Sequence, residues 1–285
     1  MSTVEKKSER RNQLIDVERV FHEKNPSMAR LIPGFIYRYL KRIIHQDYLN
    51  EFLGKHGDKR NLDFIDAVIR DFNVRIHVEG RKNIPGEGRF IFAANHALGG
   101  FDGIVLMKII SEHFPEFRFL VNDILMNVYP IKDLFLPINK HGKQAMEAAR
   151  QIDACYNSDV QILTFPAGLV SRKIRGQIID LPWQKSFIVK AVKYKRDIIP
   201  VHFSGRNTNF FYNLANLRKF LGIKSNLEML YLVDETYKHR NKDLMIKFAP
   251  PVSYKTFDKS RKPMEWAKWI KEKVYALDGV TNVPI

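Results

Sequence analysis

The hydrophobic and polar positions along the chain divide it into a helical beginning and a longer region in which strands and helices alternate. Within 58–72 the apolar residues recur at helical spacing, which predicts a helix with one core-facing stripe. From residue 73 the period changes to two, so Val74, Ile76 and Val78 predict a strand that ends at Gly80. This change of period separates an N-terminal helical segment, 1–72, from a main domain, 73–285.

Short apolar runs continue through the main domain, and each predicts a buried strand. They lie at 90–94, 117–121, 134–138, 161–165, 198–203 and 244–249. Helical stretches at 103–114, 143–156 and 185–194 lie between them, and a last helix begins at Pro263. This alternation is typical of an α/β fold. The sequence therefore predicts an αβα sandwich with a mixed, largely parallel sheet, preceded by the N-terminal helices.

The segment 29–49 is amphipathic and basic. Its apolar residues share one helical face, while Arg38, Lys41 and Arg42 crowd the polar side. The apolar face consists of Ile32, Ile36, Tyr39, Leu40 and Ile43. Such a helix either docks in a membrane interface or packs on the core with its charges in solvent. The segment alone leaves both alternatives open.

Composition and charge limit the class of protein. The 285 residues are 45% hydrophobic, which excludes a disordered chain. Lys and Arg number 47 against 31 Asp and Glu, so the net charge is +16. This charge fits nucleic acid, an anionic membrane surface or an acidic carrier protein as a partner, or simply a basic soluble surface. The single cysteine, Cys155, has no partner for an intramolecular disulfide.

The targeting and membrane-spanning signals are weak. The first residues contain no apolar stretch, so we expect no signal peptide. The most apolar stretch, 90–110, is interrupted by polar residues and glycines that a lipid-buried helix would hardly tolerate. We therefore expect a cytoplasmic protein that does not span a bilayer.

Two strand-to-helix junctions carry candidate chemistry. At the first, the strand 90–94 runs into Asn95 and His96, then Gly99, Gly100 and Asp102. A turn can place the Asp102 carboxylate on one imidazole nitrogen of His96, so that the other nitrogen acts as a general base. The alternative is an aspartate that caps a helix beside a structural histidine.

At the second junction, the strand 161–165 breaks at Pro166 and Gly168 and is followed by a basic loop. The loop brings Ser171 and the cations of Arg172, Lys173 and Arg175. A guanidinium in a short turn can bind a phosphate or carboxylate through two parallel hydrogen bonds. A plain basic loop is the alternative reading of this segment alone.

Together, in this order, the junctions resemble the lysophospholipid acyltransferase superfamily. Its members carry Asn-His with a following Asp, and later Phe-Pro-x-Gly ending near an arginine. Asn139 and Lys140 stand where the family has a strand-borne Ile-Asn/Asp-Arg segment, and Ile199-Pro200-Val201 matches its Ile-Pro-Val strand. The resemblance covers 73–251.

Within the superfamily, the chain looks most similar to the hemolysin-like branch that forms amino-acid lipids. The matching segments are 165–172, Asp180-Leu181-Pro182-Trp183, and 201–212. Two departures stand out. Ala167 replaces a glutamate of the common phospholipid-forming enzymes, and His96 and Asp102 are separated by one residue more than usual in the family. We expect Gly99 and Gly100 to absorb the extra residue.

The resemblance implies a membrane-associated O-acyltransferase at the cytoplasmic face of the membrane. His96, oriented by Asp102, would deprotonate the hydroxyl of a monoacylated lipid, which then attacks the thioester of acyl-ACP or acyl-CoA. The favoured acceptor is a lyso-amino-acid lipid of glycine or ornithine lipid synthesis; the alternative is 1-acyl-glycerol-3-phosphate. The expected substrate-binding residues are Asn95, Asn139, Lys140, Phe165, Pro166, Gly168, Ser171, Arg172, Lys173 and Arg175.

Other partners and classes are less well supported. No metal or cofactor is expected, because no histidine shows ligand spacing. A nucleic-acid-binding protein has the charge but no recognisable motif, so no nucleic acid is expected. An inactive membrane-peripheral scaffold is the other alternative, favoured by the long His–Asp spacing. The aromatic segment 210–220 either belongs to an acyl- or membrane-facing surface or is a buried core helix.

Overall fold

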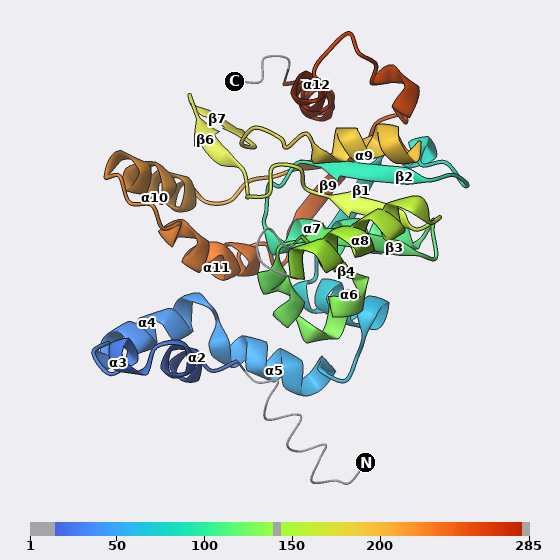
Figure 1. Cartoon of the computed structure of the whole chain (residues 1–285). Coiled ribbons are helices and arrows are strands. Elements are labelled where there is room, and N and C mark those ends of the chain that lie inside the picture. Colours follow the sequence, from blue (N-terminus) through green and yellow to red (C-terminus); the bar gives the residue numbers. More distant parts are fainter. Residues whose placement is uncertain (1–14, 139–143, 281–285) are drawn as a thin grey trace.

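Helices precede the sheet in the computed structural model, which describes residues 15–138 and 144–280 (Figure 1). The first helices are α2 (Val17–Lys24), α3 (Pro26–Ala29), α4 (Gly34–Ile43), α5 (Gln46–His56) and α6 (Asn61–Phe72). The amphipathic segment 29–49 is not one helix, because the backbone of His45 turns left-handed, with φ of 51°, between α4 and α5. No helix in the described parts of the chain is both long and apolar enough to cross a membrane.

The sheet has seven strands in the order β1-β9-β8-β2-β5-β3-β4. All neighbouring strands pair in parallel except β8 and β9, so the sheet is mixed and largely parallel, as predicted. The strands are β1 (Arg75–Glu79), β2 (Phe90–Ala94), β3 (Phe117–Val121), β4 (Phe135–Pro137), β5 (Gln161–Thr164), β8 (Asp197–Ser204) and β9 (Asp243–Phe248).

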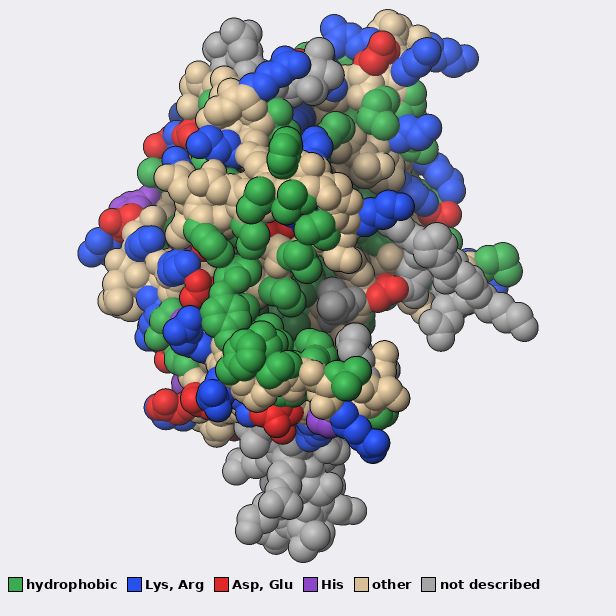
Figure 2. Space-filling model, turned by 90° about the vertical axis from the view of Figure 1, so that its left-hand side faces the viewer, with side chains coloured by type: hydrophobic (Ala, Val, Ile, Leu, Met, Phe, Trp, Pro, Cys, Tyr) green, Lys and Arg blue, Asp and Glu red, His purple; other side chains and the backbone are tan. Residues whose placement is uncertain are grey.

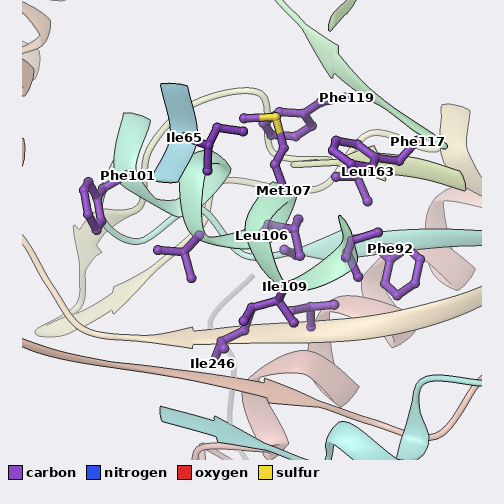
Figure 3. Close-up of a cluster of buried hydrophobic side chains, with 14 of the residues drawn as sticks. Ile65, Phe92, Phe101, Leu106, Met107, Ile109, Phe117, Phe119, Leu163 and Ile246 are labelled. Carbon is purple, nitrogen blue, oxygen red and sulfur yellow. The ribbon is translucent and has the colours of Figure 1, made fainter. Parts of the chain in front are cut away.

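Helices cover both faces of the sheet, which confirms the predicted αβα sandwich. On one face lie α6 and α7 (Gly100–Ser111). On the other lie α8 (Gln144–Asn157), α9 (Ser186–Tyr194) and α12 (Pro263–Ala276). Strand β2 contributes side chains to both hydrophobic cores, because Phe92 packs on the first face of the sheet and Ile91 on the second. Figure 3 shows Phe92 among the side chains of the first core.

Two further parts lie outside this sandwich. A small antiparallel hairpin is formed by β6 (Arg172–Ile174) and β7 (Gln177–Ile179). A helical arm consists of α10 (Asn209–Phe220), η4 (Leu227–Tyr231) and α11 (Leu232–Tyr237). In Figure 1 both lie on the left side of the molecule, where α10 and α11 stand above α4.

A buried arginine ties the second helical layer to the sheet. The Arg196 side chain is fully buried and donates to the backbone oxygens of Tyr156, Ser158 and Val160. These carbonyls lie where α8 ends and the chain turns into β5. Since a helix end leaves carbonyls without intrahelical partners, one guanidinium satisfies groups that would otherwise be buried unpaired.

We predict that Arg196→Met lowers the free energy of unfolding by roughly 3 kcal/mol or more, because several buried carbonyls lose their donors at once. Urea unfolding followed by circular dichroism measures the change. Lys255→Met, which removes a cation from an exposed position, should change the stability little. Equal effects of the two variants would contradict the structural role of Arg196.

A second prediction concerns acid stability. Burial within β8 lowers the pKa of His202 from 6.5 to about 4. Between these values the unfolded chain binds a proton that the folded chain does not, so stability falls as the pH drops through this window. His202→Gln should flatten that decline, measured as melting temperature from pH 7 to pH 4. His77→Gln, at an exposed histidine, should leave it unchanged.

Candidate active site

The candidate site lies at the carboxyl ends of β2 and β5, which are neighbours in the sheet. His96 follows β2 and Phe165 follows β5, so parallel pairing brings the two residues together. Their rings stack, with centroids 4.1 Å apart and planes inclined by 13°. Phe165 itself packs edge-on against Phe119. The imidazole is therefore held against a phenyl ring that is itself fixed by the hydrophobic core.

Asp102 reaches His96 from the first turn of α7. The distance from Nδ1 of His96 to Oδ2 of Asp102 is 3.1 Å, and the same oxygen accepts the backbone N–H of Leu98 at 2.8 Å. Gly99, just before the helix, has φ of 86° and ψ of −134°, a conformation that residues with a side chain avoid. The chain therefore fits the extra residue into the turn, and the contact between His96 and Asp102 forms.

His96 and Asp102 differ in their exposure to solvent. Asp102 is fully buried, whereas 17% of the His96 side chain is exposed. Burial raises the pKa of the Asp102 carboxyl, and the hydrogen bonds from His96 and Leu98 act against this rise. With Nδ1 directed at the carboxylate, Nε2 is the ring nitrogen left to exchange a proton with a substrate.

A second aspartate, Asp180, holds the backbone of His96. Its carboxylate lies 3.2 Å from the His96 backbone nitrogen, which donates to it, and it accepts from Ser171 Oγ at 2.6 Å and Trp183 Nε1 at 2.8 Å. The Ser171 N–H in turn donates to the His96 carbonyl at 2.7 Å. Both peptide groups of His96 are thus fixed. Asp180 lies in the segment 180–183 that matches the family, but its sequence context alone indicates no role for it.

Asn95 has a comparable positioning role. Its Nδ2 donates to the carbonyl of Phe203 at 3.0 Å, and its Oδ1 accepts the Phe203 N–H at 2.7 Å. The side chain is 2% exposed. The positions of Asn95 and Ser171 do not support the predicted contacts with substrate, because their polar atoms are engaged with the backbone and with Asp180.

Arg172, which the sequence predicts to bind the acceptor, is engaged in contacts within the protein. Its guanidinium donates to the carbonyl of Val170 at 2.6 Å and to Glu228 Oε1 at 2.9 Å, and the side chain is 8% exposed. Glu228 is fully buried and pairs through Oε2 with Arg218 at 2.8 Å. An arginine enclosed in this way holds two elements together and is poorly placed to bind an acceptor. Glu228 was missed because it lies 56 positions away in sequence.

The other predicted contact residues lie on the β6–β7 hairpin or directly after β5. Lys173 is half-buried, and Arg175 is exposed at the turn of the β6–β7 hairpin with φ of 49°. Pro166 is buried, whereas Gly168 is exposed and donates its N–H to the carbonyl of Phe165 at 2.9 Å. Two further predicted residues, Asn139 and Lys140, lie outside the described residues.

Within 15–138 and 144–280, no three His, Cys, Asp or Glu side chains gather as a metal site would require.

Comparison with known proteins places this geometry in a family. The acyltransferase family model matches residues 19–283. Two relatives named lyso-glycine lipid O-acyltransferase, from Bacteroides thetaiotaomicron and Phocaeicola vulgatus, are 46% and 43% identical over 265 residues. Each match covers 93% of this chain, and 97% and 95% of the respective relative.

A solved structure is also similar. The crystal structure of the 1-acyl-sn-glycerophosphate acyltransferase PlsC from Thermotoga maritima aligns at 18% identity and a TM-score of 0.46, over 86% of this chain and 97% of the other. The family model spans most of the chain, and both relatives match nearly end to end. The predicted resemblance is thus confirmed, and the chain belongs to the acyltransferase family.

Proposed function

We propose that this protein transfers a fatty acyl group from an acyl thioester to the free hydroxyl of a lyso-glycine lipid. The contact between His96 and Asp102 at the carboxyl edge of the sheet carries the chemistry. The acceptor follows from the names of the two relatives, which are 46% and 43% identical to this chain. The proposed donor is acyl carrier protein or coenzyme A bearing the acyl chain.

The proposed reaction uses one imidazole twice. Nε2 of His96 removes the proton of the acceptor hydroxyl while Asp102 stabilises the imidazolium through Nδ1. The oxygen attacks the thioester carbonyl, and the tetrahedral intermediate collapses with cleavage of the C–S bond. The thiolate leaves and receives the proton from His96, so the base is regenerated and an ester replaces the thioester.

The acceptor's charge suggests where its headgroup lies. A lyso-glycine lipid carries a carboxylate, for which Lys173 and Arg175 on the β6–β7 hairpin are candidate partners. Arg175 is exposed, whereas the neighbouring Arg172 is already paired with Glu228. We therefore assign acceptor binding to the hairpin cations rather than to Arg172.

The proposed location is the cytoplasmic face of a membrane, with residues 31–43, here called the N-terminal tip, as a docking element. Leu31 and Phe35 are 82% and 60% exposed, and Arg38 and Arg42 are exposed beside them. A shallow hollow of the surface is lined by Phe35, Ile36, Arg38, Tyr39 and Arg42. Exposed apolar side chains with neighbouring cations favour an anionic lipid surface.

The decisive assay supplies purified protein with acyl-ACP or acyl-CoA and three acceptors: lyso-glycine lipid, lyso-ornithine lipid and lysophosphatidate. We expect the highest kcat/KM with lyso-glycine lipid, the acceptor for which both relatives are named. Preference for lysophosphatidate would contradict the proposed acceptor, and no transfer by folded protein would favour a scaffold.

In the same assay, His96→Ala should lower kcat by about 10²- to 10⁴-fold, the usual contribution of a general base. The variant should remain folded at the assay temperature, as circular dichroism will show, although Asp102 loses one hydrogen-bond partner. The matched control is His77→Ala on the polar face of β1, which should retain full activity.

Another prediction separates the arginines of the basic loop. Arg172→Met should lower the free energy of unfolding by about 3 kcal/mol, because Glu228 loses a buried partner. Arg175→Met should leave stability unchanged but raise KM for the acceptor by roughly tenfold, the effect of one charge-assisted hydrogen bond. The reverse pattern would restore Arg172 as the anion-binding residue.

A further inference from the structure

The helical arm, residues 209–237, exposes a series of large apolar side chains. Phe220 is 86% exposed, and Leu217 and Leu221 are more than half exposed. Others on the arm are Phe210, Ile223, Leu227, Leu230 and Val233. We propose that this arm is a second membrane-binding element, which inserts these side chains into an anionic lipid surface beside the N-terminal tip. The proposal rests on the proposed function, since the lipid acceptor resides in a membrane.

The exposed side chains of α10 differ from those that it buries against the rest of the protein. On α10, Phe211, Tyr212 and Ala215 are buried, and Val170 lies in the same cluster as the two aromatic rings. Phe210, Leu217 and Leu221 recur at the spacing of a different helical face, and each of them is at least half exposed. A soluble protein rarely keeps so many apolar side chains together on its surface unless they bind something.

The charges of the arm suit an anionic lipid. Its acidic side chains are all turned inward or paired: Glu228 is fully buried with two arginines, Glu235 is 1% exposed, and Asp234 pairs with Lys238 at 2.6 Å. Lys219 and Lys224, by contrast, are exposed at the end of α10 and in the following loop. The outward face therefore presents apolar groups and cations, which matches lipid tails and anionic headgroups.

The arm and the N-terminal tip form one continuous surface. The hydroxyl groups of Tyr39 on α4 and Tyr231 on η4 are 2.6 Å apart, although the residues are 192 positions apart in sequence. Phe210 packs edge-on against Tyr231 with centroids 4.9 Å apart. Figure 2, which views the side where α4, α10 and α11 lie, shows hydrophobic side chains running down the middle of this face. Both segments can therefore meet the same lipid surface.

A bilayer fits this face better than an acidic carrier protein. The exposed side chains of the arm include four leucines, one isoleucine and two phenylalanines, with two lysines at one end. An acidic protein would be recognised chiefly by a cluster of cations. A loop end that exposes Phe220, Leu221 and Ile223 together is suited to enter a lipid layer.

Vesicle cosedimentation tests the proposal. The arm variant is Leu217→Glu with Phe220→Glu, the tip variant is Leu31→Glu with Phe35→Glu, and the control is Val189→Glu with Val192→Glu. The two control valines are exposed on α9, which belongs to the second helical layer. With equimolar phosphatidylglycerol and phosphatidylcholine, we expect the arm variant to bind at least about tenfold more weakly than the control, because two large apolar side chains no longer enter the lipid. Melting temperatures should be alike.

The contribution of Lys219 and Lys224 is tested by comparing binding to anionic and to neutral vesicles. Lys219→Glu with Lys224→Glu should weaken binding to vesicles with phosphatidylglycerol by roughly tenfold or more, and change binding to pure phosphatidylcholine far less. Unchanged vesicle binding of the arm variant would overturn the proposal. So would a selective loss of binding to acyl carrier protein with vesicle binding intact.

Failure of this proposal is distinguishable from failure of the proposed function. A short-chain lyso-glycine acceptor is soluble without a membrane. With this acceptor the arm variant should keep the wild-type kcat, because Leu217 and Phe220 are not part of the candidate active site. If the wild type transfers no acyl group but the arm variant still loses vesicle binding, the result supports the membrane-binding arm and contradicts the proposed reaction.

Discussion

The buried carboxylate of Asp180 is the interaction on which the site depends. It lies at the end of the β6–β7 hairpin, fully buried, and accepts from the backbone of His96, the hydroxyl of Ser171 and the indole of Trp183. A buried carboxylate is costly unless its oxygens are hydrogen-bonded. The loops that follow β2 and β5 therefore close around it together, and His96 takes its place as part of that closure.

The same arrangement connects the catalytic edge of the sheet to the outer arm. Arg172 follows Ser171 directly and pairs with Glu228 on η4, which also pairs with Arg218 on α10. Both oxygens of Glu228 are thus used: Oε1 accepts from Arg172 and Arg218, and Oε2 accepts from Arg218. The proposed lipid-binding surface and the candidate base are joined by a short series of buried polar contacts, so the two are held in a fixed relation.

The fold was largely predictable because its signals are local. Strands such as 90–94 and 117–121 are continuous apolar runs, and their observed limits match the predicted ones. The partners of the polar residues were not predictable in this way. Asn95 pairs with Phe203 and Arg172 with Glu228 across 108 and 56 positions, and a local pattern does not encode such contacts. The break at His45 was missed because the hydrophobic period continues through it.

The stacking of Phe165 on His96 limits how a proton can travel. A ring pressed flat against a phenyl group and tethered through Nδ1 cannot turn over between two steps without losing both contacts. Under the proposed mechanism, the nitrogen that accepts a proton from the alcohol must be the same one that delivers it to sulfur. The alcohol oxygen and the departing sulfur must then approach one point in space, so the two acyl chains would have to enter the protein from directions that converge on Nε2 of His96.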